Sequence, residues 1–459
     1  MKRILITLLA CLAVLSVSAQ TVCLSLDDCL RSAENQSNAV RSSRLDCEAA
    51  LGRRTEARME WFPSVSISAL AFHSLNPLID ITVTDVLGKS EAAWNIRNAF
   101  EDLAAKYGFN SHFTALNYGW TAAVSLMQPI YAGGRIVNGN RLASLGVEAA
   151  RLQLRQKERD NFLNIEKAYW QVVSLQEKAM TLRRSEELLD SLKKDVESAA
   201  GAGLATPSDV SRVMLKKKEL QSGKVQLEGG TRLAKMALLN EAGIQFCVVR
   251  GNASATRPYI DDIYLAGDVE DLQAPENYYV PEEELAQGTA ESRLLQLQVE
   301  AKALEKKMSL GESLPQVGIG ASYGYGRMMG EPRANGMLYA MVSVPVSDWG
   351  KAAGRMKRLE AERQKAEGDK EFYGKQLVLQ ASSLWVQLCC AWEQMQVSSE
   401  SIVIAAENQR QTSCSYEAGL CTLSELLEAQ LSLRNAENQH IDDCIAYRMA
   451  LSEYLSLQR

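Results

Sequence analysis

The stretch Pro129-Ile130-Tyr131-Ala132-Gly133-Gly134-Arg135 decides the fold, because the chain carries it twice. The second copy, Pro345-Val346-Ser347-Asp348-Trp349-Gly350-Lys351, lies 216 residues further along the chain. Another pair of matching stretches, Ala202–Val210 and Ala418–Leu426, is separated by the same 216 residues. The common offset indicates an internal repeat with no insertion or deletion between the matching stretches.

A long proline-free segment separates the matching stretches in each repeat, from Arg135 to Gly203 and from Lys351 to Gly419. In the first segment, apolar residues recur at spacings of three and four, which is typical of one face of a helix. They include Phe162, Ile165, Tyr169, Val172, Leu175, Ala179 and Leu182. A helix of this length spans roughly 100 Å, whereas helices of globular proteins average about 11–12 residues. The sequence therefore predicts two rods, over 135–202 and 351–418.

Each rod is followed by a turn and a shorter return helix, predicted over 208–241 and 423–458. Glycine at the end of a helix favours such a turn, because glycine adopts positive φ at little cost. Thr422 and Glu425 have the spacing of a capping box, and the stretch Thr206–Asp209 is its shorter analogue. Two interpretations of Asp209 and Glu425 stay open. These acids only cap the helices, or they also place negative charge beside the turns.

Four stretches alternate between apolar and other residues, which predicts strands. They are Val65–Phe72, Tyr118–Leu126, Val317–Tyr325 and Leu338–Val344. The glycines of Gly318–Gly326 suggest a phosphate loop, but the stretch lacks a following Lys-Ser/Thr and has strand periodicity. Trp120, Tyr323 and Tyr325 are either aromatics at a membrane interface or ordinary strand residues.

The four strands suit a membrane β-barrel, since each has one apolar face and about 8–12 residues. Four strands cannot close a barrel, because the smallest membrane barrels use about eight. The sequence therefore predicts a mainly α chain with long antiparallel helical hairpins and four strands. A trimer would supply twelve strands, which form a 12-stranded barrel, and twelve helical rods.

The predicted organisation follows the repeat. Residues 1–19 resemble a secretory signal peptide with a cleavage site at Val17-Ser18-Ala19, and the alternative is a lipidation site at Cys11. The first repeat covers 20–241, with a helix over 26–60, a strand hairpin over 62–130 and a long, irregular and polar connection over 73–117. An irregular equatorial linker over 242–281 leads to the second repeat, 282–459. That repeat has a helix over 282–312 and a hairpin over 314–346.

Charge and cysteine content exclude some classes of function. Without Lys2 and Arg3 the chain carries 48 basic and 56 acidic side chains, a net charge of −8, which argues against nucleic acid as a partner. Nine cysteines remain, and Cys23 with Cys29 is the one local pair considered as a disulfide. The others are read as small buried residues. No catalytic, cofactor-binding or metal site is expected.

At the duplicated strand exits and the duplicated Gly-Leu turns, the chain resembles the TolC family of outer-membrane efflux and secretion ducts. The resemblance covers essentially the whole chain after residue 19. It implies a homotrimer in the outer membrane of a Gram-negative bacterium, with a periplasmic helical domain that forms a tunnel, or α-barrel. It also implies a periplasmic adaptor protein that links the tip to an inner-membrane pump.

The resemblance also assigns roles to residues near the turns. It implies that Gly203, Leu204, Gly419 and Leu420 contact the adaptor. It places Asp209, Tyr416, Glu425 and Glu428 at a tip gate or acidic ring. Cys421 stands where related proteins can carry a gating arginine, so closure by that ion pair is not expected here.

The function predicted is a passive exit duct of a tripartite efflux pump or a type I secretion system, in contact with outer-membrane lipid. The alternative is a non-conducting coiled-coil protein that spans the periplasm, or an adhesin. The two apolar strand hairpins favour the duct, because a spacer has no use for them. The sequence does not specify the cargo or the adaptor.

Overall fold

The computed structural model describes residues 22–75, 79–82, 91–107, 112–115, 118–203, 205–250, 257–267, 272–327, 331–346 and 350–458. The chain divides into two compact units, and each unit contains parts of both repeats. The first unit comprises Met1–Ala49, Val147–Val299 and Ala366–Arg459. The second comprises Ala50–Gly146 and Glu300–Lys365.

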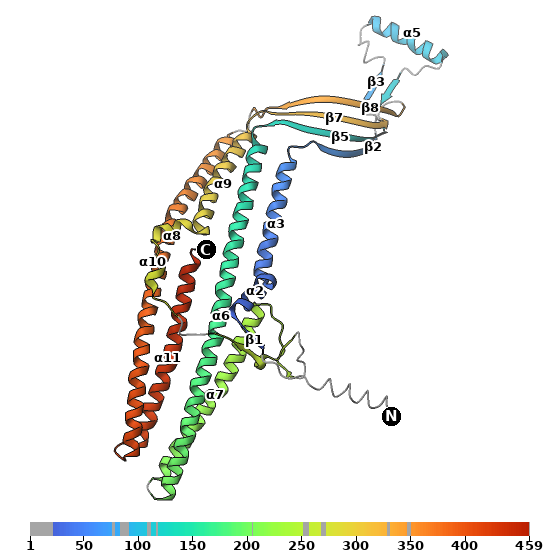
Figure 1. The fold of residues 1–459 in the computed structure, drawn as a ribbon. Coiled ribbons are helices and arrows are strands. Elements are labelled where there is room, and N and C mark those ends of the chain that lie inside the picture. The colour runs from blue at the N-terminus through green and yellow to red at the C-terminus, as the bar shows by residue number, and fades with distance from the viewer. Residues whose placement is uncertain are drawn as a thin grey trace, which may run out of the picture. The chain divides into compact units, whose positions relative to one another are not determined.

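The four longest described helices form two hairpins (Figure 1). One hairpin joins α6 (Arg135–Gly201) to α7 (Pro207–Glu241), and the other joins α10 (Lys351–Glu417) to α11 (Leu423–Ser456). Helices α6 and α10 have 67 residues each, which corresponds to about 100 Å of helix rise. No helix in the described ranges contains a stretch apolar and long enough to cross a bilayer.

Three fully buried tyrosines hold the core of the first unit together. They are Tyr169 on α6 and Tyr447 and Tyr454 on α11. The Tyr169 hydroxyl donates to the Leu24 carbonyl at 3.3 Å, and the Tyr454 hydroxyl accepts from the Val280 N–H at 3.1 Å. Because buried hydroxyls need partners, these bonds fix short segments of the chain against the long helices.

Those short segments include a strand pair that the sequence did not predict. β1 (Val22–Leu24) pairs in parallel with β6 (Ile263–Leu265), and β6 lies in the region 242–281 that was expected to be an irregular linker. A strand of three residues is too short to show an alternating pattern. The neighbouring elements are α2 (Leu26–Gln36), η2 (Ile260–Asp262), η3 (Pro275–Tyr278) and α8 (Glu282–Gly288).

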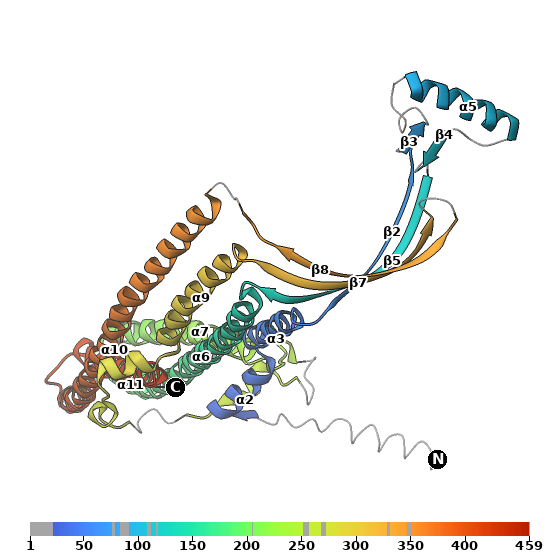
Figure 2. The same ribbon diagram turned by 90° about the horizontal axis from the view of Figure 1, so that it is seen from above.

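The second unit contains an antiparallel sheet in the order β2-β5-β7-β8 (Figure 2). Its strands are β2 (Ser64–His73), β5 (Tyr118–Ala132), β7 (Gln316–Arg327) and β8 (Arg333–Ser343). The register of β5 against β7 shifts between Pro129 and Tyr131, where proline has no N–H to contribute to the ladder. Within this sheet β2 and β8 each have one partner, so both edges are unpaired.

One face of the sheet is apolar on all four strands. Ile67 lies opposite Val124, which lies opposite Tyr323, and directly paired residues share a face. Ile67 is 80% exposed and Leu338, on the edge strand β8, is 85% exposed. A continuous apolar surface is therefore uncovered in the single chain.

The helices next to the sheet meet its strands at close-packed glycines. α9 (Ala290–Glu312) precedes β7, and Gly311 lies against Gly133, which follows β5. A Cβ built on Gly133 would lie 2.1 Å from the Gly311 carbonyl oxygen, and Gly133 has a φ of +62°. Only glycine satisfies both the conformation and the backbone contact.

Two helices expected to be continuous are broken. The predicted helix over 26–60 is interrupted at Ser37, which has extended backbone and donates through its hydroxyl to Asn161 Oδ1 at 2.9 Å. It continues as α3 (Asn38–Met59). The predicted helix over 282–312 is interrupted at Thr289, which is also extended. At the second break the Thr289 hydroxyl accepts from the Ser292 N–H at 3.3 Å, so a short polar side chain gives the backbone an alternative hydrogen bond.

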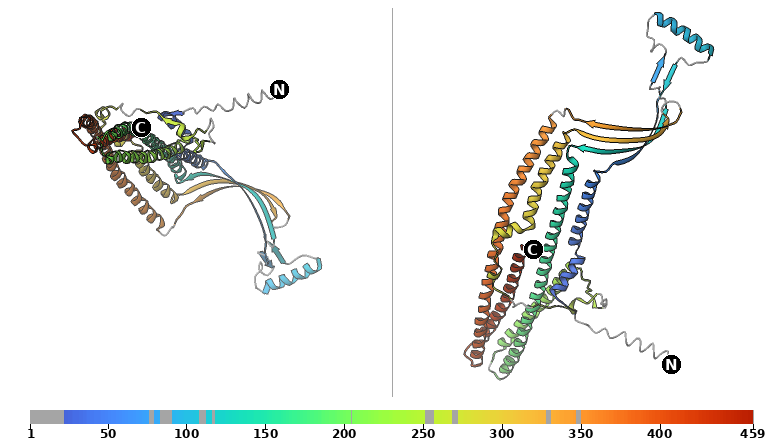
Figure 3. Two further views of the ribbon diagram at one scale, coloured as in Figure 1. Left: turned by 90° about the horizontal axis from the view of Figure 1, so that it is seen from below. Right: turned by 45° about the horizontal axis from the view of Figure 1, so that its top comes forward.

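The connection over 73–117 was expected to be irregular, and this expectation was wrong. It contains the helix α5 (Glu91–Tyr107), which lies in the chain between β3 (Ile79–Thr82) and β4 (His112–Ala115) (Figure 3). β3 and β4 pair with each other in antiparallel fashion. The connection is therefore a structured insertion in the first strand hairpin.

Candidate functional site

Two glycines form the turns that join the long helices to the return helices. Gly203 has a φ of +76° and Gly419 a φ of +70°, values that cost other residues roughly 1–2 kcal/mol. A Cβ placed on either glycine would meet no atom within 4 Å. The backbone conformation therefore requires glycine at both turns, while the space around each turn is open.

The second turn also exposes a leucine. The Leu420 side chain is 82% exposed, although its N–H donates to the Ser415 carbonyl at 2.8 Å and fixes the backbone. Leu204, the matching residue of the first repeat, lies outside the described residues. The second turn thus combines an open glycine backbone with an apolar side chain in solvent.

The acid after each turn is part of a capping box, as predicted for Thr422–Glu425. The Glu425 N–H donates to the Thr422 hydroxyl at 3.4 Å, and the Thr422 N–H donates to the Glu425 carboxylate at 2.7 Å. Thr206 and Asp209, predicted as a shorter analogue, form the same complete box. The hydrogen bonds from Thr206 hold the pKa of Asp209 below its usual value. The Asp209 carboxylate therefore stays charged while it caps its helix.

Apolar side chains from both hairpins pack beneath the turns. They belong to one cluster that includes Leu189, Val196, Val213, Leu423 and Leu426, with Tyr416 packed against it. Burial raises the pKa of Tyr416, and the negative charges of Asp209 and Asp195 raise it further. Tyr416 of the second repeat therefore lies near the capping acid of the first, so the structure brings these two predicted residues together.

Cys421 faces its own hairpin. Its thiol lies 3.4 Å from the Thr412 carbonyl, and burial together with the charge of Glu425 raises its pKa. The thiol therefore stays neutral at neutral pH. All nine described cysteines are free, so the considered disulfide between Cys23 and Cys29 is absent from the described part of the chain.

Glu428 and its counterpart in the first repeat, Arg212, differ in their contacts. Arg212 donates to the Ser424 hydroxyl at 2.9 Å and so connects α7 to α11. Glu428 is exposed, and no hydrogen bond or ion pair to it occurs among the described residues. Among the described tip acids that were predicted, Glu428 is therefore the one that does not cap a helix.

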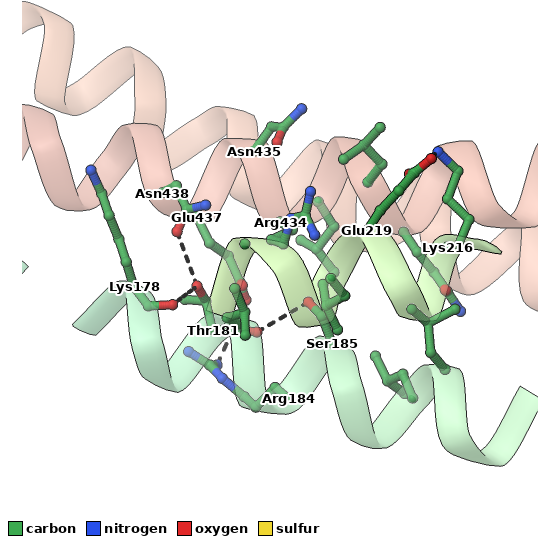
Figure 4. Close-up of a pocket in the computed structure, with 18 of the residues that line it drawn as sticks. Lys178, Thr181, Arg184, Ser185, Lys216, Glu219, Arg434, Asn435, Glu437 and Asn438 are labelled. Atoms are coloured by element: carbon green, nitrogen blue, oxygen red, sulfur yellow. Dashed lines mark hydrogen bonds and ion pairs between the residues drawn. The ribbon is translucent and has the colours of Figure 1, made fainter. Parts of the chain in front are cut away.

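A cavity of about 450 Å³ lies further along the hairpins, between α6, α7 and α11 (Figure 4). Polar contacts join α6 to α11 there. The Thr181 hydroxyl donates to Asn438 at 2.9 Å, and Arg184 lies 3.6 Å from Glu437. Lys178 pairs with Asp442 at 2.6 Å beside the cavity. Sequence reasoning missed this polar contact, although the polar run at 434–440 interrupts the apolar stripe of α11.

The three aromatic residues proposed for the membrane interface lie on the apolar face of the sheet. Trp120 and Tyr325 make an edge contact with ring centroids 5.6 Å apart. Tyr323 lies two residues before Tyr325 in β7 and is 65% exposed. Arg327 lies over the ring of Tyr118 at 5.0 Å, at the same end of the strands as Trp120.

The family model of the outer membrane efflux proteins matches residues 29–240 and 293–452, which is most of the chain. The chain belongs to the outer membrane efflux protein family. Members of this family are channel proteins rather than enzymes. A comparison with curated proteins finds no match.

Solved structures of this fold agree over almost the whole chain. The outer membrane protein VceC of Vibrio cholerae has a TM-score of 0.70 at 15% identity and covers 94% of this chain and 95% of its own. The CmeC outer membrane channel of Campylobacter jejuni has a TM-score of 0.72 at 11% identity, with coverages of 94% and 85%. The open MtrE channel of Neisseria gonorrhoeae has a TM-score of 0.68 at 12% identity, with 94% and 88%.

These likenesses confirm the predicted fold class, in which long antiparallel helical hairpins accompany four strands and an internal two-fold repeat. The chain is homologous to outer membrane efflux channels. The roles of the tip residues and of the strand aromatics are taken up below.

Proposed function

We propose that three copies of this chain form a channel in the outer membrane of a Gram-negative bacterium, and that the channel is the exit duct of a tripartite efflux pump. The observation that supports this most directly is the sheet. It has a continuous exposed apolar face and two unpaired edges, in a chain of the outer membrane efflux protein family.

Unpaired edges are the reason for assembly. In lipid each unsatisfied backbone group costs several kcal/mol, so β2 of one copy needs a strand from the next copy. The β8 edge supplies it, and three copies give a closed barrel of twelve strands. Trp120, Tyr323 and Tyr325 then face the lipid as interfacial aromatics.

The turns suit docking of a periplasmic adaptor. Gly203 and Gly419 leave the backbone open to close approach, and Leu420 offers an apolar contact. The adaptor connects the duct to an inner-membrane pump, so that the pump acts on the duct indirectly. A type I secretion system uses the same arrangement with a protein cargo.

A narrow tip would concentrate the field of its acids. Asp209, Glu425 and Glu428 occur once per copy, so each contributes three charges around the axis of a trimer. Tyr416, near Asp209, lies where it can help to close the tip. Cys421 is neutral and takes no part in an ion-pair gate.

Reconstitution of the purified protein in planar bilayers tests the proposal. Discrete conductance steps are expected, together with recovery of the protein in the outer-membrane fraction. A protein that remains soluble and gives no conductance would instead be the periplasmic spacer or adhesin, and the duct would be refuted.

A further inference from the structure

Helix α5 carries a seam of apolar residues with a strict alternation of three and four. Ala93, Ile96, Phe100, Leu103 and Tyr107 occupy successive positions of this pattern. The pattern is that of the a and d positions of a heptad repeat. In coiled coils the residues at these positions pack between neighbouring helices. Such a seam is too regular to be explained by a connecting loop.

Four side chains of the seam are exposed in the described part of the chain. Ile96 is 54% exposed, Phe100 49%, Leu103 55% and Tyr107 65%. In proteins most of the stability of a helix comes from the packing of its apolar face, so the exposed seam favours a partner for α5.

The composition of α5 disfavours a lipid surface as that partner. Helices that lie on membranes have a broad apolar face and a polar face rich in Lys and Arg. In α5, Arg97 and Lys106 flank the seam, so the apolar face of the helix is narrow. Together with Glu91, Glu101 and Asp102 they give α5 a net charge of −1. Arg97 is moreover paired with Glu101 at 2.9 Å. An anionic membrane surface gains little from such a helix.

The position of α5 in the sheet topology points to another copy of the chain. The helix is inserted in the hairpin of β2 and β5, and β2 is an edge strand of the sheet. In the trimer proposed above, this edge is where one copy meets the next. Each subunit boundary therefore carries one α5, and tethering raises the effective concentration of the helices to the millimolar range, about that of short flexible linkers.

We propose that the α5 helices of the three copies pack against one another through this seam, as a short parallel coil at the outer mouth of the assembly. The inference rests on the proposed trimer and adds to it a self-association surface outside the sheet. Phe100 and Leu103 lie at its centre, and the charged residues stay at its margin.

Photo-cross-linking in living cells tests the contact directly. A benzoylphenylalanine replaces Phe100 in the seam or, as the matched control, Trp94, which is 59% exposed on the opposite side of α5. Irradiation is expected to join copies at position 100 and not at position 94, and peptide mass spectrometry is expected to find the bond within residues 91–107 of another copy.

A second pair of variants adds equal charge to the two sides of the helix. Ile96→Glu with Leu103→Glu is expected to reduce the position-100 product roughly tenfold or more, because each change places a charge in a buried contact. Asn95→Glu with Asn98→Glu is expected to leave the product unchanged.

The outcomes separate the two proposals. Sedimentation of the purified protein as a monomer refutes the trimer. A trimer without cross-links between α5 helices refutes only this inference, and cross-links from position 100 to lipid would assign the seam to the membrane instead.

Discussion

Gly203 and Gly419 have the same conformation at the two turns, and neither turn is crowded. At the scale of single residues, a side chain at either position would have two separate effects, one on the backbone and one on the space beside the turn. A larger residue would strain the backbone of the turn, and it would also fill the open space beside it. If the adaptor docks here as proposed, one substitution at a turn removes docking without disturbing the packed helices.

Replacement of Gly203 or Gly419 by valine is expected to abolish export while the amount of trimer stays within about twofold of the wild type. A β-branched residue at positive φ is strained by roughly 1–2 kcal/mol, and its methyl groups cover the turn. Sensitivity to toxic compounds measures export, and gel migration without heating measures the trimer. Gly229→Val is the control, since Gly229 lies inside α7 with open space around it.

Neutralising Glu425 and Glu428 to glutamine is expected to weaken the cation preference of the channel and its block by multivalent cations. Glutamine at position 425 still accepts the capping bond, so the helix should remain intact. Reversal potentials in a salt gradient measure the preference. Glu367→Gln with Glu371→Gln removes two carboxylates from α10 as a control. Unchanged selectivity in the tip variant would leave Glu425 with the capping role alone.

The sequence was sufficient to predict the residues of the caps and turns, because these depend on neighbours within four positions. It was not sufficient for Tyr416 and Asp209, which lie in different repeats and meet only through the packing of the two hairpins. The pairing of Thr181 with Asn438 depends on the same packing. Contacts of this kind leave no local pattern in the chain.

At the scale of elements, ion pairs connect helices α9 and α10 beside the sheet. Lys306 lies 2.6 Å from Glu360, which also pairs with Arg363 at 2.9 Å. Hydrogen bonds from Arg363 and then from Lys306 lower the pKa of Glu360 from 4.5 to about 2. Because the folded pKa is depressed, the contribution of Glu360 to stability is complete above about pH 4.5 and is lost as the pH falls toward 2.

The variant Glu360→Gln is accordingly expected to unfold at a lower temperature than the wild type at pH 7. The difference should shrink as the pH falls from about 4.5 toward 2, because the Glu360 carboxylate takes up a proton in the unfolded chain before it does so in the folded protein. Thermal unfolding followed by circular dichroism at pH 7, 4 and 3 measures it. Glu371→Gln removes a pair within α10 alone and is expected to have a smaller effect. A difference independent of pH would contradict the role of the ion pair.

Helix α5 and the break at Ser37 show why some elements were missed while the long helices were predicted. The rods were predictable because their apolar period continues over many turns, and length makes the pattern unambiguous. In α5 the pattern covers few turns between polar stretches, and it was overlooked. At Ser37 the break depends on a hydrogen bond to Asn161, which is remote in the chain.

At the scale of the whole molecule, the two faces of the sheet should respond differently to charge. Leu338→Arg places a charge on the apolar face of β8, where a membrane site costs roughly 2–4 kcal/mol. Asn335→Arg places the same charge on the opposite face of the same strand. The first variant is expected to reduce assembled trimer in the outer membrane severalfold, and the second to leave it nearly unchanged. Equal amounts would mean that lipid does not cover this face.

The repeat offset and the four alternating stretches were enough to predict the two helical hairpins and the four strands, since each pattern is visible in the sequence itself. The buried tyrosines that fix the short segments were not predictable as such, because their carbonyl partners are between 97 and 174 residues away. Every residue has a backbone carbonyl, so the type of the partner residue does not indicate such a long-range hydrogen bond.

The pairing of β1 with β6 has a consequence for the order of events during export. A chain that enters the periplasm N-terminus first releases residues 22–24 long before residues 263–265, so β1 has to wait for its partner. During this delay β5 can pair with β2 but not with β7, which follows residue 263, so one edge of β5 is unpaired and open to aggregation. A chain that ends before residue 263 cannot form the pair of β1 with β6.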